Sequence, residues 1–165
     1  MVKSTIIQLT CLVSLGLIAS IDFRHFVAPN FLTYPCLLIG LIGNLLINTN
    51  AFLFSCLSAC LGYGLLWCIN QGYLKMRKQH GIGGGDMKTA AAIGACFGWA
   101  SLLNIVQWAA LIAIAHHICL SLHPKRLFNT MRKIPFVPYL FCSALLVWLT
   151  LHAQQFHCIL ERMQN

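Results

Sequence analysis

Apolar residues fill four long stretches of the chain, and the charged residues lie between them. No Asp, Glu, Lys or Arg occurs in residues 4–21, 25–74, 89–124 or 134–160. A helix that crosses a bilayer needs roughly 20 mostly apolar residues, so these stretches have room for about one, two, two and one spans. The pattern therefore predicts an all-α polytopic membrane protein with about six transmembrane helices joined by short loops.

The predicted helices leave no room for a sizeable soluble domain, so we expect residues 1–165 to form a single transmembrane domain. The expected spans are 6–21, 31–47, 51–69, 89–103, 105–122 and 135–152. The first span is also compatible with a secretory signal peptide, because Lys3 precedes it and Ala19-Ser20 end it.

The basic residues predict an orientation. The loops at 22–30, 71–88 and 123–134 hold all of the 11 Lys and Arg residues except Lys3 and Arg162. Loops rich in Lys and Arg stay in the cytoplasm, so we place these three loops there and both termini outside.

Composition supports the membrane class. Only 8% of the residues are charged, against about 25% in soluble domains. The net charge of +8 lies in the loops, so it indicates membrane topology, with the lipid bilayer and not nucleic acid as partner. The 9 cysteines include no C-x-x-C pair and lie mostly in the spans, so we interpret them as small apolar side chains and expect no metal site.

The chain contains only two aspartates, Asp22 and Asp86, and both fall on the predicted cytoplasmic side. Ionisable groups at membrane depth are costly and tend to be functional. Asp86 could instead cap the helix that follows it. Two carboxylates held close together share one proton and can activate water against a peptide carbonyl. The hypothesis is therefore a joint functional site.

A glycine-rich loop leads into Asp86. The sequence Gly81-Ile82-Gly83-Gly84-Gly85-Asp86 offers backbone freedom and lets another chain approach closely. An extended substrate beside Asp86 would need that room. A phosphate-binding loop is not indicated, because no Gly-Lys-Ser/Thr follows.

Three segments in order resemble the type IV prepilin peptidases, over about residues 5–150. Asp22-Phe23-Arg24 with Pro29-Asn30 is similar to the family's D-x-R…P-[ND] element. Gly83-Gly84-Gly85-Asp86-Met87-Lys88 is similar to G-x-G-D-x-K. Ile134-Pro135-Phe136-Val137-Pro138-Tyr139-Leu140 is similar to I-P-F-G-P-[FYW]-L, with Val137 where the family usually has glycine.

The resemblance implies a membrane aspartic endopeptidase in which Asp22 and Asp86 are the catalytic residues. Gly83 and Gly85 would shape the loop, and Lys88 and Arg24 lie in the motifs as substrate or loop residues. The family removes the basic leader from type IV prepilins or pseudopilins at the cytoplasmic face of the bacterial inner membrane. Pilus and type II secretion assembly proteins are further candidate partners.

Longer members of the family carry two zinc-binding C-x-x-C pairs, and many methylate the new N-terminus. Neither pair occurs in this sequence, so we expect no zinc and no cofactor. S-adenosylmethionine would be required only if methylation is retained. Two alternatives stay open: another G-x-G-D intramembrane protease, and a small proton-coupled transporter that uses the acids as a relay.

Overall fold

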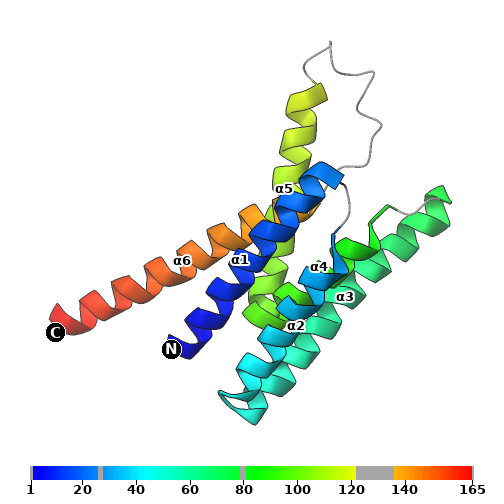
Figure 1. Cartoon of the computed structure of the whole chain (residues 1–165). Helices are drawn as coiled ribbons and strands as arrows, with labels where there is room; N and C mark the ends of the chain where they lie inside the picture. Colours follow the sequence, from blue (N-terminus) through cyan, green and yellow to red (C-terminus); the bar gives the residue numbers. More distant parts are fainter. Residues whose placement is uncertain (1, 26–27, 79–80, 122–135, 165) are drawn as a thin grey trace.

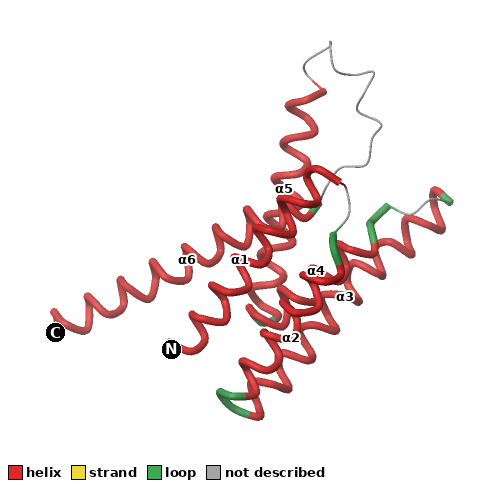
Figure 2. Tube along the Cα trace, in the orientation of Figure 1, coloured by secondary structure: helices red, strands yellow, loops and turns green. Residues whose placement is uncertain are grey.

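A computed structural model describes the backbone of residues 2–25, 28–78, 81–121 and 136–164. These residues form helices and no strand, which confirms the all-α fold (Figures 1 and 2). The helices are α1 (Val2–His25), α2 (Asn30–Leu45), α3 (Thr49–Arg77), α4 (Gly84–Phe97), α5 (Trp99–Ser121) and α6 (Val137–Gln164). The expected loop 123–134, with four of the basic residues, lies outside the described residues.

Within the part of the chain that the structure describes, three helices are long and apolar enough to cross a membrane. These segments are Lys3–His25, Thr49–Arg77 and Trp99–Cys119, and two shorter apolar segments are Asn30–Leu45 and Val137–Ala153. At 14 residues, α4 rises only about 21 Å against about 30 Å of bilayer core. The number of six spans stays a prediction.

Several helix ends differ from the expected ones. Helix α3 continues to Arg77, so the first part of the expected loop 71–88 is helical. Gly98 has a φ of 79° and separates α4 from α5 inside the expected span 89–103. That left-handed conformation favours glycine and ends a helix. As a result, α5 begins at Trp99 and not at residue 105.

Helix α4 lies at the centre of the bundle, where it contacts all five other helices. Its residues 89–97 are all buried. A Cβ atom added to Gly94 would lie 2.4 Å from the carbonyl oxygen of Ser58, and one on Gly62 would lie 2.6 Å from that of Ala90. The backbones of α3 and α4 therefore touch, as small residues allow between membrane helices.

The C-terminal end of α4 is held by polar side chains. The carbonyl oxygen of Ala95 accepts hydrogen bonds from Asn44 Nδ2 at 3.0 Å and from Ser55 Oγ at 2.9 Å. The last carbonyls of a helix have no partner within the helix. Asn44 on α2 and Ser55 on α3 supply one, so a short helix can end inside the bundle.

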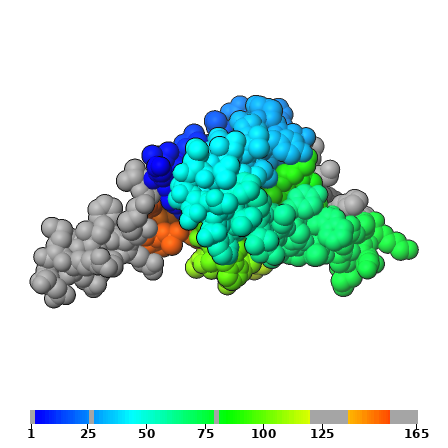
Figure 3. Space-filling view, turned by 90° about the horizontal axis from the view of Figure 1, so that it is seen from below, coloured from blue at the N-terminus to red at the C-terminus, as the bar shows by residue number. Residues whose placement is uncertain are grey.

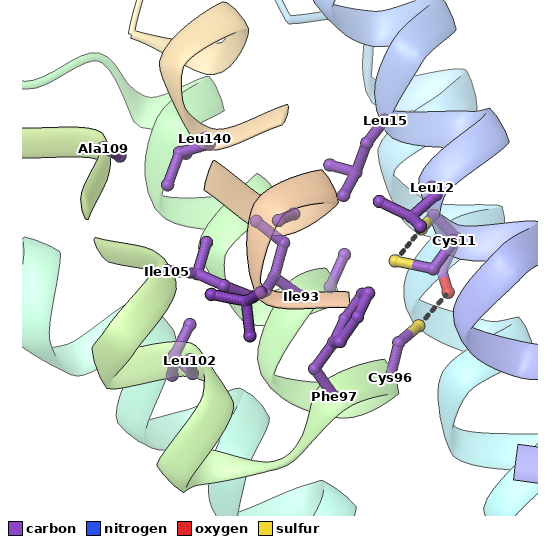
Figure 4. Packing of buried hydrophobic residues seen from close by; sticks show 14 of the residues in the cluster. Cys11, Leu12, Leu15, Ile93, Cys96, Phe97, Leu102, Ile105, Ala109 and Leu140 are labelled. Atoms are coloured by element: carbon purple, nitrogen blue, oxygen red, sulfur yellow. Dashed lines mark hydrogen bonds between the residues drawn. The ribbon is translucent and has the colours of Figure 1, made fainter. Parts of the chain in front are cut away.

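Large apolar side chains fill the space between α1, α4, α5 and α6. Leu15, Ile93, Ile105 and Leu140 are fully buried and meet there (Figure 4). Burial of such a side chain stabilises a fold in water by about 1.5–3 kcal/mol, although in lipid close packing takes over this role. The cluster holds α1 and α6 against α4, which carries Asp86.

Helix ends gather on two opposite sides of the bundle. The C-terminal ends of α1, α3 and α5 lie toward one side, and the N-terminus and the α2–α3 turn lie toward the other (Figure 1). The α2–α3 turn is at the front when the molecule is viewed from below (Figure 3). This is the alternation that successive membrane crossings require.

Candidate active site

Asp86 lies in the first turn of α4, where Gly83 is the N-cap residue. Its backbone N–H donates to the Gly83 carbonyl at 3.1 Å, and its Oδ2 accepts from the Gly83 N–H at 3.2 Å. Free N–H groups at a helix N-terminus favour a nearby negative charge. The alternative reading of Asp86 as a capping residue is therefore correct, and it does not conflict with a chemical role.

Gly85 allows the chain before α2 to approach α4. A Cβ atom at Gly85 would lie 2.7 Å from the Cβ of Ala28, which is closer than real Cβ atoms pack. At Gly84, by contrast, an added Cβ would meet nothing within 4 Å. Of these two neighbouring glycines, Gly85 is thus the one that close approach requires, and Gly84 is spatially free.

Asp22 occupies the end of α1 and is almost completely buried, at 4% exposure. Its Oδ2 has no hydrogen-bond partner among the described residues. The backbone N–H of Val137, the first residue of α6, lies beside the carboxylate. Val137 also packs against Ile18 and Ala19 on the preceding turn of α1. The third motif therefore supplies a helix N-terminus to Asp22.

Asp22 acts on the carboxyl group of Asp86. Burial and the negative charge of Asp22 raise the pKa of Asp86 from 3.8 to about 6, against the opposing effect of the Gly83 N–H. Asp86 precedes the apolar part of α4, at the end of the bundle. No Lys or Arg among the described residues forms an ion pair with either aspartate. The charge of Asp22 therefore favours the protonated form of Asp86.

Lys88 ties α4 to the start of α2. Its Nζ donates to Asn30 Oδ1 at 2.9 Å and lies 5.3 Å from the centroid of the Tyr34 ring. Lys88 thus contacts the Pro29-Asn30 element and neither aspartate. Arg24 is exposed in the last turn of α1. The geometry assigns Lys88 a structural contact and gives no contact for Arg24.

Sequence reasoning missed Asn70. This buried side chain on α3 accepts hydrogen bonds at Oδ1 from the backbone N–H groups of Gly81 at 3.0 Å and Ile82 at 3.1 Å. It therefore fixes the start of the glycine loop to α3. The available signal was one amide side chain at the end of a long apolar stretch, shortly before a run of glycines.

An apolar groove lies beside the site, between α2, α3 and α4. It has a volume of about 660 Å³, and Lys88 is its one charged wall residue. Tyr34, Leu37 and Tyr63 form much of the apolar wall. The groove reaches α4 at Lys88 and Ala91, and Asp86 is not among its lining residues.

These features define a class: a polytopic helical membrane protein with one buried and one half-buried carboxylate at one end of its bundle. The chain belongs to the type IV leader peptidase family, whose family model matches residues 9–118. This finding confirms the expected family. The matched region holds Asp22, Asp86 and the glycine loop, and the third motif lies beyond it.

Named relatives agree with this assignment. The chain is 37% identical over 120 residues to the prepilin leader peptidase/N-methyltransferase of Escherichia coli (strain K12), covering 73% of this chain and 52% of that protein. It is 34% identical over 122 residues to the protein of the same name from Burkholderia pseudomallei (strain 1026b), covering 74% and 39%. It is 31% identical over 126 residues to leader peptidase HopD of Escherichia coli, covering 76% and 81%.

The chain thus spans about half, or less, of the first two relatives and most of the third. No solved structure matches the chain.

Proposed function

We propose that this protein is a membrane aspartic endopeptidase that removes the basic leader from type IV prepilins or pseudopilins. We place the cleavage at the cytoplasmic face of the inner membrane, because the sequence predicts that the loops with most of the Lys and Arg residues lie on the same side as Asp22 and Asp86. The names of the relatives support the substrate class. One feature carries the mechanism: burial and the charge of Asp22 raise the pKa of Asp86, and each carboxylate lies beside a helix N-terminus.

The chemistry requires that the pair hold one proton. The ionised carboxylate takes a proton from water as the water oxygen attacks the scissile carbonyl carbon. The protonated carboxyl donates to the carbonyl oxygen, which gives a neutral tetrahedral intermediate. The intermediate then collapses: the ionised carboxylate takes a hydroxyl proton as the carbonyl re-forms, the C–N bond breaks, and the protonated carboxyl gives its proton to the leaving nitrogen. The pair again holds one proton. The two aspartates titrate as one unit, so neither holds a fixed role at rest.

The surrounding residues would position this pair. Gly85 lets the residues before α2 lie close to α4, and Asn70 holds the loop that precedes Asp86. Lys88 joins α4 to α2, so we assign it positioning and not proton transfer. Methylation is no part of this proposal, and S-adenosylmethionine would be required only if that second activity is retained.

A cleavage assay tests the proposal. The purified full chain is reconstituted in liposomes with a prepilin and, separately, with an unrelated membrane peptide. We expect cleavage of the prepilin alone, and a loss of rate of about 1,000-fold or more in Asp22→Asn and in Asp86→Asn. Gly64→Ala is the matched control, since a Cβ there meets nothing within 4 Å.

Full cleavage by either folded aspartate variant would refute the pair. Equal cleavage of both substrates would indicate a less specific G-x-G-D protease. Proton flux into the same liposomes that depends on Asp86, without cleavage, would favour the transporter.

A further inference from the structure

Three cysteines from different helices meet in the core, away from the two aspartates. Cys11 on α1, Cys36 on α2 and Cys96 on α4 are 1%, 1% and 5% exposed. Cys36 Sγ lies 3.4 Å from Cys11 Sγ, and all three sulfur atoms lie within 4.8 Å of one another. Figure 4 shows Cys11 and Cys96 with the dashed lines that mark their hydrogen bonds to Cys36. Sequence reasoning did not find this cluster, because the three residues are far apart in the chain.

We propose that this cluster is a binding site for one thiophilic divalent d10 metal ion, of the zinc and cadmium class. An ion about 2.3 Å from each of three sulfur atoms in a plane places them about 4.0 Å apart. The observed separations reach this arrangement with shifts of less than about 1 Å. Sulfur donors select soft ions over calcium or magnesium.

The apolar surroundings limit the net charge of the metal–sulfur complex. The thiols lie in an apolar cluster with Ile7, Leu12, Leu15 and Phe97. A net charge in such a place is costly. Two thiolates and one neutral thiol around a divalent ion give a neutral complex. The apolar surroundings are therefore compatible with a divalent ion at this site.

The hydrogen bonds between the cysteines indicate which sulfur atoms would bind the ion as thiolates and which one as a thiol. Cys36 donates its S–H toward Cys11, and Cys96 donates toward the Cys36 carbonyl oxygen at 3.7 Å. Cys96 can keep that bond and coordinate as a neutral thiol. Cys11 and Cys36 would then lose their protons to solvent as the ion enters and bind as thiolates. Because the thiols are buried, the ion would enter as the helices assemble.

An ion at this point would join three helices that also carry site residues. Asp22 lies on α1, Asn30 on α2 and Asp86 on α4. A metal bound only by the folded bundle stabilises it by mass action. This inference does not depend on the peptidase activity, so the two can fail separately.

The test uses the full chain with its six other cysteines changed to alanine, refolded in detergent with cadmium ions and, separately, with magnesium ions. We expect one cadmium ion per chain, sulfur-to-cadmium charge-transfer absorption, and a higher midpoint of thermal unfolding with cadmium only. Cys11→Ser and Cys36→Ser should each weaken cadmium binding by about 100-fold or more, and Cys96→Ser by less.

A second readout does not depend on folded variants. In the wild-type chain, bound cadmium should slow alkylation of Cys11, Cys36 and Cys96 together, as mapped by mass spectrometry. X-ray absorption of the zinc-loaded chain should show three sulfur neighbours. Absence of binding, protection of other cysteines only, or a Cys11–Cys36 disulfide in place of the ion would overturn the proposal.

Discussion

Gly85 and Gly84 are adjacent, yet they face different constraints. A methyl group at Gly85 would meet Ala28 at 2.7 Å, and one at Gly84 would meet nothing within 4 Å. We expect Gly85→Ala to destabilise the chain by about 1–3 kcal/mol, because Ala28 lies on the backbone that leads into α2. Gly84→Ala should be neutral or stabilising by up to about 1 kcal/mol, since alanine is the better helix former.

Thermal unfolding in detergent, together with cleavage rates, measures this difference. If both alanine variants lose stability equally, close contact is not the reason for glycine at position 85.

The pKa of Asp86 also makes a prediction about stability. Its pKa rises from 3.8 to about 6 on folding, so the folded chain binds this proton more tightly than the unfolded chain. The stability from this group is fully present below about pH 4 and is lost as the pH rises through about 6. Asp86→Asn removes the charge and keeps an acceptor for the Gly83 N–H.

We therefore expect Asp86→Asn to be more stable than the wild type by about 3 kcal/mol near pH 8, and nearly equal to it near pH 4. Denaturant unfolding across this pH range measures the difference. A constant difference at every pH would show that the carboxyl is not buried as described.

At the scale of elements, the glycine loop depends on α3. Asn70 accepts two hydrogen bonds from the loop backbone. Asn70→Ala should free the start of the loop and lower the cleavage rate by about 10-fold or more, with helix content unchanged. Asn70→Asp keeps the accepting oxygens and should retain more activity. Comparison of cleavage rates and circular dichroism tests this; equal rates in all three chains would remove Asn70 from the site.

The sequence predicted the helices better than the residues at which they begin and end. The charge-free stretches were enough to predict the all-α class, and the two aspartates marked the site. The pattern could not show that α3 continues to Arg77, because polar residues at a bilayer edge suit a helix and a loop equally. It also missed the break at Gly98, since glycine is common inside membrane helices.

The deeper parts of the site were not readable in sequence. In the sequence, Val137 is a residue where the family motif usually has glycine. In the structure, its backbone N–H lies beside Asp22. The thiol cluster joins three helices, and its members carry no local spacing signal. Such groups become visible only when packing brings distant segments together.

At the scale of the whole molecule, the ends of α1 and α3 should face the cytoplasm. Asn50 lies near the α2–α3 turn and Met76 near the end of α3, and both are exposed. In spheroplasts, we expect Asn50→Cys to react with a membrane-impermeant thiol reagent. Met76→Cys should react only after lysis, with the wild-type chain as background. Labelling in the reverse order would place the site on the outer face.

The central claim is that Asp22 and Asp86 form one coupled pair, and carboxyl titration by nuclear magnetic resonance tests it most directly. Labelling aspartate side-chain carbons should give two signals, because the chain has no other aspartate. In the wild type, Asp86 should titrate with a pKa of about 6. In Asp22→Asn, the pKa of Asp86 should fall, because the neighbouring charge is gone. An Asp86 pKa near 3.8 in both chains would contradict the pair.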